Sequence, residues 1–317
     1  MIFTNLALFL FFLFILVNCA GYAIKYSSRL ARALHLPEFL VSFFIIAIIS
    51  VLPEAIISII SALKGEPQLG LGTLLGSNVA DLTLVFGVVA LFSSGGIKVK
   101  SKILNDKFFY LIFLLFPLLL GFDGRLSRID GSILILVGSL FLARIYSESK
   151  RFHKKFNHPK EGPLLKNLFL LILSLAIILA SAFLTVKFAV NFANDARVPA
   201  ILVGIAILAL GTCLPELIFS IRAVRKNHDE LALGDILGTV VTDATIILGL
   251  VALISPFSYN PASIYVTGGA MFLAGIFVII FMKSDRDLSK SEGLFLIFFY
   301  ILFILIEFLV NHILRLS

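Results

Sequence analysis

The chain has 317 residues, of which 60% are hydrophobic and 14% are charged, and its net charge is +7. Soluble domains are typically about 45–50% apolar and about 25% charged, so this composition excludes a soluble globular enzyme and a disordered chain. The apolar residues form blocks of roughly twenty instead of alternating with polar residues, which also excludes an outer-membrane barrel. The composition indicates an all-α integral membrane protein.

Ten apolar segments follow one another along the chain, and most have the length that crosses a bilayer as a helix. The N-terminal segment has no basic residue before it, which favours a retained first helix over a signal peptide. Both cysteines lie inside apolar segments, so no disulfide framework is expected. The ten predicted transmembrane helices are at residues 5–24, 38–63, 70–93, 107–121, 131–147, 165–188, 199–224, 231–255, 262–282 and 292–314.

Basic residues are distributed unevenly between alternate loops. The odd-numbered loops and adjoining helix ends hold 20 Lys and Arg residues, whereas the even-numbered loops and both termini hold 6. The positive-inside rule therefore places the odd-numbered loops in the cytoplasm and both termini outside the cell. This distribution accounts for the positive net charge without a nucleic-acid partner, and we expect a multi-pass protein of the plasma membrane.

Two stretches of the chain are similar to each other at one constant spacing, which we call the repeat offset. Residues 47–91 align with 209–253 without a gap and are identical at 20 of 45 positions. We therefore predict a first five-helix repeat at 1–150, a basic cytoplasmic linker at 151–164 and a second five-helix repeat at 165–317. Because each repeat has an odd number of spans, the two must cross the membrane in opposite directions. This inverted arrangement is typical of secondary transporters, whose ion site lies at the repeat interface near the midplane.

Four acidic residues lie inside predicted spans as two matched pairs, Glu54 with Glu216 and Asp81 with Asp243. A carboxylate at the bilayer centre costs about 3 kcal/mol or more on insertion scales. Buried acids can be neutralised by Lys or Arg, but the middles of these four spans contain neither. A bound cation is the simplest remaining counter-charge.

The residues around these acids offer further oxygen ligands. Each glutamate follows a proline, which removes one helical hydrogen bond, so we expect nearby carbonyls, including those of Ala47 and Ala209, to be partly freed for an ion. Hard cations such as Ca²⁺ bind six to eight oxygens. Hydroxyl residues also lie four positions before each acid, on the same helix face; they are Ser50, Ser77, Thr212 and Thr239.

Two polar residues break the match between the repeats. Asp235 stands opposite Thr73 and therefore has no acidic counterpart. We expect it at a helix end or along an access path. Asn78 stands opposite Val240, and we expect its amide to donate a hydrogen bond between helices.

The paired stretches resemble the two repeats of the cation/Ca²⁺ exchanger superfamily, most closely its Na⁺/Ca²⁺ exchanger branch. The resemblance is carried by LPE at 52–54 with GSNVAD at 76–81, and by GTCLPE at 211–216 with GTVVTD at 238–243. It implies that Glu54 and Glu216 ligate Ca²⁺ and share in Na⁺ binding. The other implied positions are the carbonyls of Ser50 and Thr212 at the Ca²⁺ site, oxygens of Ala47, Ser77, Ala209 and Thr239 at flanking Na⁺ sites, and Asp81 and Asp243 at the middle.

The same resemblance implies a transporter and not an enzyme. Several Na⁺ would enter down their gradient while one Ca²⁺ leaves, by alternating access in which the first and sixth spans slide over a fixed core. No cofactor is implied beyond the transported ions, and the protein is expected to function as a monomer in the lipid bilayer.

Three positions depart from the family pattern. Val51 and Cys213 replace hydroxyl residues expected at Na⁺ sites, and Asp81 stands where Na⁺/Ca²⁺ exchangers often have Asn. Crowding by three other acids favours the protonated form of Asp81. The coupling ion is therefore open, and the alternative is a Ca²⁺/H⁺ exchanger or a divalent-cation exchanger that involves K⁺.

Two other functional classes fit the sequence less well. An intramembrane aspartyl protease would need a Gly-x-Gly-Asp string, and the nearest string, LALGD at 231–235, lacks the first glycine. A channel would need a continuous pore, whereas inverted repeats around an acidic cage suit occluded binding better.

Overall fold

The computed structural model describes residues 2–33, 47–93, 95–98, 107–149, 163–227, 229–259, 261–284 and 287–316. Nearly all of them are helical, as the composition predicted. The helices of the first half are α1 Ile2–Ala33, α3 Ala47–Ser50, α4 Leu52–Leu63, α5 Pro67–Ala80, the π-helix η2 Asp81–Val85, α6 Phe86–Phe92, α7 Lys107–Leu120 and α8 Arg128–Ser149. Those of the second half are α9 Leu164–Ala196, α10 Ala200–Val203, the π-helix η4 Gly204–Leu208, α11 Ala209–Thr212, α12 Leu214–Val224, α13 Asp229–Thr242, the π-helix η5 Asp243–Ile247, α14 Leu248–Ile254, α15 Pro261–Ser284 and α16 Lys290–Leu316.

Seven helical segments in the described residues are long and apolar enough to cross a membrane. Helical residues also occupy each of the other three predicted spans, as α3 with α4, as α7 and as α8. Residues 38–46 of the second predicted span and most of the predicted linker, 151–162, lie outside the described residues. A multi-pass helical membrane protein is therefore confirmed, while the count of ten spans stays a prediction.

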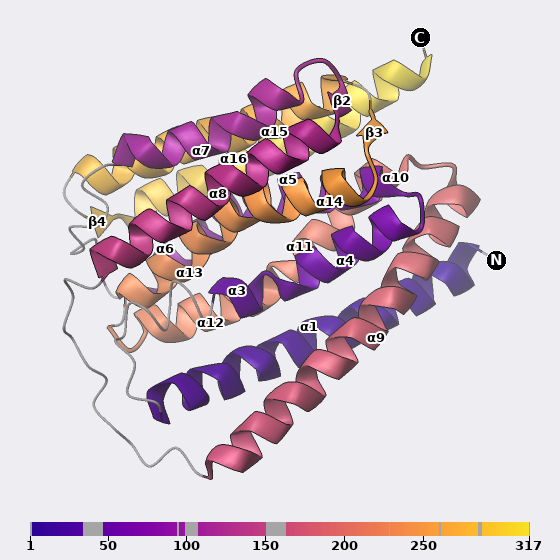
Figure 1. Ribbon diagram of the computed structural model, residues 1–317. Helices are drawn as coiled ribbons and strands as arrows, with labels where there is room; N and C mark the ends of the chain where they lie inside the picture. Colours follow the sequence, from indigo (N-terminus) through magenta and orange to yellow (C-terminus); the bar gives the residue numbers. More distant parts are fainter. Residues whose placement is uncertain are drawn as a thin grey trace.

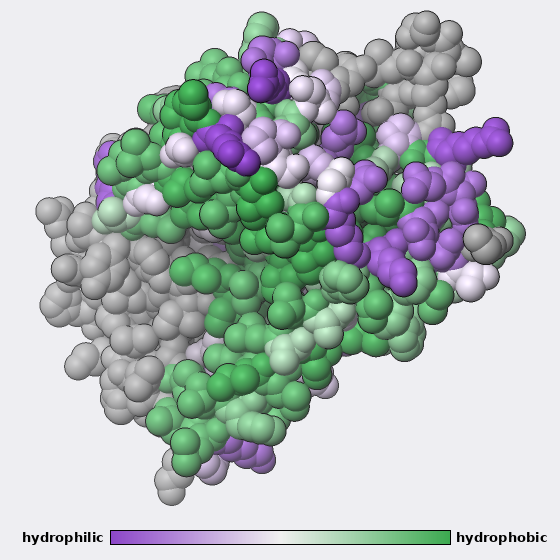
Figure 2. Space-filling model, turned by 45° about the vertical axis from the view of Figure 1, so that its right-hand side comes forward, coloured by the Kyte–Doolittle hydropathy of each residue, from purple (hydrophilic) through white to green (hydrophobic). Residues whose placement is uncertain are grey.

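The surface of the helices is largely apolar. Phe3, Phe14 and Phe298 are all more than 60% exposed, which would be costly in water but suits contact with lipid tails. Figure 2 shows hydrophobic residues covering much of one face, with hydrophilic residues gathered mainly towards its upper and right-hand parts.

Each of the two long segments that carry a Pro-Glu pair is interrupted just before its proline. The interruption between α3 and α4 is at Val51, and the one between α11 and α12 is at Cys213. Proline at the second helical position is tolerated because its missing N–H has no partner in the first turn. The prolines thus begin new helices inside spans. In Figure 1, α3 and α4 run from left to right, and α10 to α12 run from right to left.

Short strand pairs close the two ends of the bundle. β1 (Ile97–Lys98) pairs with β4 (Asp287–Leu288), and β2 (Arg125–Leu126) pairs with β3 (Phe257–Ser258), both antiparallel. Figure 1 shows β4 at one end of the molecule, and β2 and β3 at the other. Each pair joins a loop of the first half to a loop of the second.

The helices that follow β2 and β4 begin with the same capping arrangement. Ser127 and Ser289, which correspond at the repeat offset, precede α8 and α16. The Ser127 amide and hydroxyl donate to Asp130 at 2.8 and 2.6 Å. The Ser289 amide and hydroxyl donate to Glu292 at 2.8 and 2.7 Å. These reciprocal caps satisfy amides that a helix N-terminus otherwise leaves unpaired.

Close contacts between glycines attach α8 and α16 to the central helices. A Cβ on Gly131 of α8 would lie 2.7 Å from the Gly249 carbonyl oxygen of α14, and one on Gly293 of α16 would lie 2.9 Å from the Gly87 carbonyl oxygen of α6. The second contact repeats the first at the repeat offset, with the halves exchanged. Small residues allow such close helix approach in membranes.

Helices α1 and α9 form a pair along the lower side of the molecule in Figure 1. Their buried side chains, including Phe9, Leu16 and Val186, form a cluster with Ile57 and Leu69 of the central helices, and this cluster is distinct from the large core. Asn5 of α1 donates a 2.8 Å hydrogen bond to Asp195 of α9. The pair is thus joined internally and packs against the central helices from one side.

Candidate ion-binding site

The four matched acids lie close enough together to interact electrostatically. Glu54 and Glu216 are each the third residue of a helix, α4 and α12, directly after a proline. Asp81 and Asp243 are the first residues of the π-helices η2 and η5. All four side chains are 0% exposed, so burial of both predicted pairs is observed.

Most of their carboxylate oxygens have no hydrogen-bond partner. Within the described chain, both oxygens of Glu54, Glu216 and Asp81, and Oδ1 of Asp243, are buried without one. Burying an ionised carboxylate without compensation is strongly unfavourable. Such groups are therefore stable only when they are protonated or when cations neutralise them.

The halves meet through hydroxyls that point at acids of the opposite half. The Ser77 hydroxyl of α5 donates to the Leu74 carbonyl oxygen of its own helix at 3.0 Å and also lies 3.5 Å from Oδ2 of Asp243. The Ser50 hydroxyl of α3 donates to Oδ1 of Asp235 at 3.0 Å and lies 3.1 Å from the Thr239 hydroxyl. Ser77 thus approaches an acid of the opposite half, although its position on the helix face was predicted beside Asp81.

Thr212, like Ser77, donates its hydroxyl to backbone carbonyls of its own segment. Its hydroxyl donates to the carbonyl oxygens of Leu208 at 3.0 Å and Ala209 at 3.2 Å, within its own segment. The Ala209 carbonyl also accepts the Cys213 amide at 3.2 Å. The expectation of a freed carbonyl at Ala209 is therefore wrong in this structure, because the turn before Pro215 keeps it bonded. Ala47 begins α3, and its side chain lies outside the described residues.

Asp235 is a further buried acid beside the four matched acids, and the expectation of a helix end was wrong. It lies in the middle of α13 and is 0% exposed. Its carboxylate is close enough to act electrostatically on Glu54, Asp81 and Glu216. The sequence did contain a signal, because Asp235 is an acid inside an apolar span. It was not assigned to the site because its counterpart in the first repeat is not acidic.

Asn78 does not form the expected bond between helices. Its side chain is 0% exposed, and neither its amide nitrogen nor its amide oxygen has a partner in the described structure. It therefore adds an unsatisfied amide beside Ser77 on α5.

The π-helical turns at Asp81 and Asp243 were not anticipated. Insertions of this kind are frequent at functional sites. Thr83 and Thr245, which also correspond at the repeat offset, each donate a hydroxyl to the carbonyl one turn earlier, that of Val79 and that of Val241. The sequence repeat already pairs these two threonines. Helix propensities, however, do not distinguish a π-turn from an α-turn, so the π-turns could not be predicted.

The acids do not form a compact metal cluster by themselves. Among the described residues, no three Asp, Glu, His or Cys side chains lie close enough together to hold a metal ion without other ligands. A cation between them would therefore also need hydroxyl and carbonyl oxygens.

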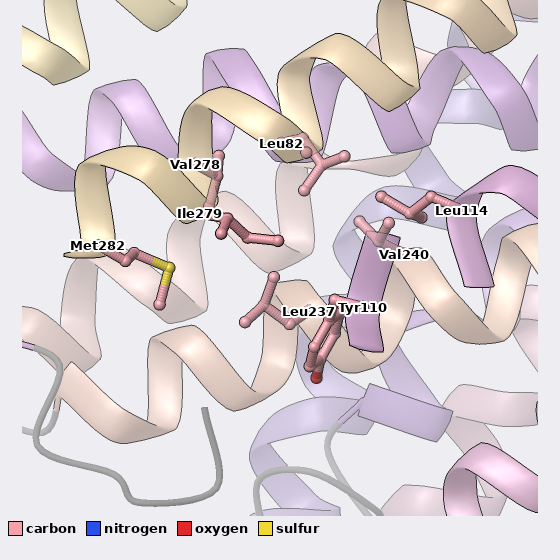
Figure 3. A pocket seen from close by; sticks show the side chains of 9 residues that line it. Leu82, Tyr110, Leu114, Leu237, Val240, Val278, Ile279 and Met282 are labelled. Atoms are coloured by element: carbon pink, nitrogen blue, oxygen red, sulfur yellow. The ribbon is translucent and has the colours of Figure 1, made fainter. Parts of the chain in front are cut away.

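A small pocket elsewhere in the core is apolar. It lies between α5–η2, α7, α13 and α15, and Figure 3 shows Leu82, Leu114, Leu237 and Val240 among the side chains around it. Tyr110 brings the only hydroxyl among the lining residues. This lining offers no carboxylate, so the pocket is distinct from the acidic cluster.

Comparison with known proteins identifies the family. The model of the sodium/calcium exchanger protein family matches residues 4–146 and 166–309, one range in each predicted repeat. The chain belongs to this family. The resemblance inferred from the repeat motifs is thereby confirmed. The protein is a multi-pass membrane transporter.

Individual relatives match over almost the whole exchanger. The sodium/calcium exchanger MaX1 of Methanosarcina acetivorans is 25% identical, over 97% of this chain and 99% of its own. The inner membrane protein YrbG of Escherichia coli is 28% identical, over 92% of each chain. A solved structure of the sodium-calcium exchanger NCX_Mj, soaked with Na⁺ and Sr²⁺, superposes with a TM-score of 0.70 and 25% identity, over 95% of this chain and 98% of that chain.

Proposed function

We propose that this protein exchanges Na⁺ for Ca²⁺ across the plasma membrane by alternating access. The observation that carries the proposal is the set of four buried acids at the meeting of the two halves, with seven of their eight oxygens unpartnered in the described structure. Membership of the sodium/calcium exchanger family and likeness to MaX1 and NCX_Mj support these ions as the cargo.

The proposed Ca²⁺ position lies between Glu54 and Glu216. Two carboxylates neutralise one divalent ion, and hard cations favour carboxylate and carbonyl oxygens. The carbonyls of Ser50 and Thr212 would complete this position, since each lies one turn before its glutamate.

The proposed Na⁺ positions flank the Ca²⁺ position. Ser77 and Thr239 would supply hydroxyl oxygens, and Ala47 and Ala209 would supply carbonyl oxygens. Asp81 and Asp243 would face the middle. Because the Ala209 carbonyl is bonded to Cys213 in this structure, it can join an ion only if that turn opens or if it shares its second lone pair.

We propose an inverted arrangement of two five-helix repeats in ten spans, with both termini outside and one chain as the working unit. The opposite courses of α3–α4 and α10–α12 support it, as do the caps and glycine contacts that recur at the repeat offset. Sliding of α1 and α9 over the core belongs to the same proposal; the pair packs on the central helices through a cluster that is distinct from the large core.

A second candidate is exchange of Ca²⁺ for H⁺. Val51 and Cys213 bring no hydroxyl oxygen to positions where the family pattern has one, and Asp81 adds a buried carboxyl that can carry a proton. This candidate uses the same site and differs only in the coupling ion.

The deciding experiment measures Ca²⁺ uptake into vesicles that contain the purified protein. An outward Na⁺ gradient should drive uptake, and a pH gradient without Na⁺ should not. Uptake that follows the pH gradient and ignores Na⁺ would replace the first candidate with the second.

Substitution of the glutamates tests the site itself. Glu54→Gln and Glu216→Gln should each abolish Ca²⁺ uptake while leaving a folded protein, because the shape is kept and one charge is lost. Glu66→Gln is the matched control, since Glu66 precedes α5 in a loop and its side chain caps nothing. Full uptake in both site variants would remove these residues from the proposed site.

A further inference from the structure

Beyond Glu216 in the direction of Arg225, the helical hairpin α12–α13 carries a second polar layer. Ser220 lies one turn past Glu216 on α12, and Asp235 lies one turn before Thr239 on α13. At 1.5 Å per residue, this layer is displaced by about 6 Å from the layer of Glu216. Both side chains are 0% exposed.

A hydrogen-bonded chain joins this layer to the first half of the protein. Ser50 donates to Oδ1 of Asp235 at 3.0 Å, and its hydroxyl oxygen is 3.1 Å from that of Thr239. A hydroxyl has one proton to donate. When Ser50 gives it to Asp235, its oxygen can accept the Thr239 hydroxyl, so Thr239, Ser50 and the carboxylate form one contiguous polar group.

Two oxygens in the layer have no such partner. Oδ2 of Asp235 and Oγ of Ser220 are buried without a hydrogen bond in the described residues. The Ser220 hydroxyl nevertheless lies close enough to the Asp235 carboxylate to interact with its charge. An unpartnered carboxylate oxygen and an unpartnered hydroxyl thus lie next to each other in a fully buried layer.

The corresponding layer of the first half differs from this one in charge and in hydrogen bonding. Ser58 and Thr73 occupy the positions of Ser220 and Asp235 at the repeat offset. Their hydroxyls donate to backbone carbonyls, Ser58 to Gly70 at 3.3 Å and Thr73 to Leu69 at 2.8 Å. That layer is neutral and satisfied, whereas the layer with Asp235 carries a charge and two open oxygens.

We propose that Asp235, Ser220, Ser50 and Thr239 form a binding position for one Na⁺ on the Arg225 side of the central cluster. Carboxylate and hydroxyl oxygens are hard ligands that suit such an ion. A single carboxylate matches a single positive charge, and a Ca²⁺ ion would require more. The inference rests on the proposed function and deepens it, because it gives the two faces of the exchanger different affinities for Na⁺.

The charges of the cluster favour the same assignment. Asp235 makes five fully buried acids together with Glu54, Asp81, Glu216 and Asp243. One Ca²⁺ compensates two of them, so the remainder need monovalent cations or protons. Asp235 has the Ser50 hydroxyl on one oxygen and no described partner on the other, so it can hold a cation without displacing the ion at Glu216.

Asp235→Asn tests the proposal in the full-length protein, in vesicles where the Na⁺ concentration is varied on one face at a time. The half-saturating Na⁺ concentration on the face of Arg225 should rise about tenfold, because a charged contact to a buried cation is lost. The value on the other face and the half-saturating Ca²⁺ concentration should change much less, because Asp235 acts on the Ca²⁺ position only electrostatically, from the neighbouring layer. Thr73→Val is the matched control in the first half and should leave both faces unchanged.

Binding to the purified protein supplies a readout that does not require transport. NaCl should raise the thermal unfolding temperature of the wild type at lower concentrations than it does in Asp235→Asn. If that variant fails to fold, Asp235→Thr, which copies the first-half layer, replaces it and should behave in the same way. Unchanged Na⁺ dependence in the variants, or an equal loss of Na⁺ and Ca²⁺ affinity, would overturn the proposal. The proposed function alone would be contradicted if the wild type transports no Ca²⁺ while Na⁺ still stabilises the wild type and not the Asp235 variants.

Discussion

The hydroxyl of Ser77 contacts Oδ2 of Asp243 at 3.5 Å across 166 residues of sequence. The thiol of Cys213 approaches the carbonyl oxygen of the same serine at 3.6 Å. Ser77 therefore contacts the second half through both its side chain and its backbone. A cation bound beside Asp243 would therefore lie next to a hydroxyl of the first half.

Asp243→Asn should lower Ca²⁺ uptake into vesicles about tenfold or more, because charged contacts contribute about 1.5–3 kcal/mol when they are buried. The amide oxygen can still accept the Ser77 hydroxyl, so the loss should come from charge and not from folding. Asp195→Asn serves as the control on an exposed acid that contacts Asn5. Wild-type uptake in Asp243→Asn would show that this acid holds no transported ion.

Gly131→Ala should lower the thermal unfolding temperature of the detergent-solubilised protein. The added Cβ would lie 2.7 Å from the Gly249 carbonyl oxygen, a backbone atom that cannot rotate away. Overpacking of this kind typically costs about 1–3 kcal/mol. Gly269→Ala is the control, because its Cβ would meet nothing within 4 Å. Equal unfolding temperatures for the two variants would show that the α8–α14 contact relaxes freely.

Ser127→Ala and Ser289→Ala should each destabilise the protein by about 1 kcal/mol, the usual effect of losing an N-cap side chain. Each serine accepts a helix amide at 3.3 Å and donates to an acid. Ser132→Ala, whose hydroxyl only donates to the Arg128 carbonyl within α8, should have little effect. Denaturation measured by circular dichroism gives the stability of each variant. A larger loss of stability in Ser132→Ala than in the other two variants would contradict the prediction.

A cross-link between α4 and α9 should stop exchange if α1 and α9 slide over the core. The Lys64 ammonium lies 3.9 Å from the Phe183 ring centroid and donates to the Phe183 carbonyl at 3.2 Å. A short bifunctional thiol reagent on Lys64→Cys with Phe183→Cys, in a Cys19→Ser background, should abolish Ca²⁺ uptake.

The matched control for that cross-link stays inside the sliding pair. Asn5→Cys with Asp195→Cys replaces a contact between α1 and α9 themselves, so the same reagent should leave uptake unchanged. Single-cysteine variants control for chemical modification alone. Normal exchange in the fully cross-linked Lys64–Phe183 variant would rule out the sliding.

Val51→Ser combined with Cys213→Ser should strengthen the dependence of Ca²⁺ uptake on Na⁺. Val51 is 2% exposed and Cys213 is 3% exposed, next to the prolines of α4 and α12. Each substitution adds a hydroxyl oxygen where the family pattern has one. The measurement is the half-saturating Na⁺ concentration, and an unchanged value would mean that these two positions do not contact the ion.

The four matched acids could be predicted from the sequence because the prediction needed only local information. Glu54 and Glu216 follow prolines inside apolar blocks, and Asp81 and Asp243 recur at one offset, so their cost in lipid could be recognised without coordinates. The capping boxes at Ser127 and Ser289 were not predicted, although Ser followed by an acid three residues later is a known signal of a helix start.

The sequence by itself determined the membrane class, the family and the four matched acids, because apolar block length and repeat spacing are properties of the chain order alone. Only the tertiary structure decided which groups meet. Ser50 reaches Asp235 over 185 residues, and Ser77 contacts Asp243 instead of the nearer Asp81, because packing of the two halves and not helical periodicity sets those distances. The same packing placed Asp235 inside the acidic cluster, although its counterpart in the first repeat is a neutral threonine.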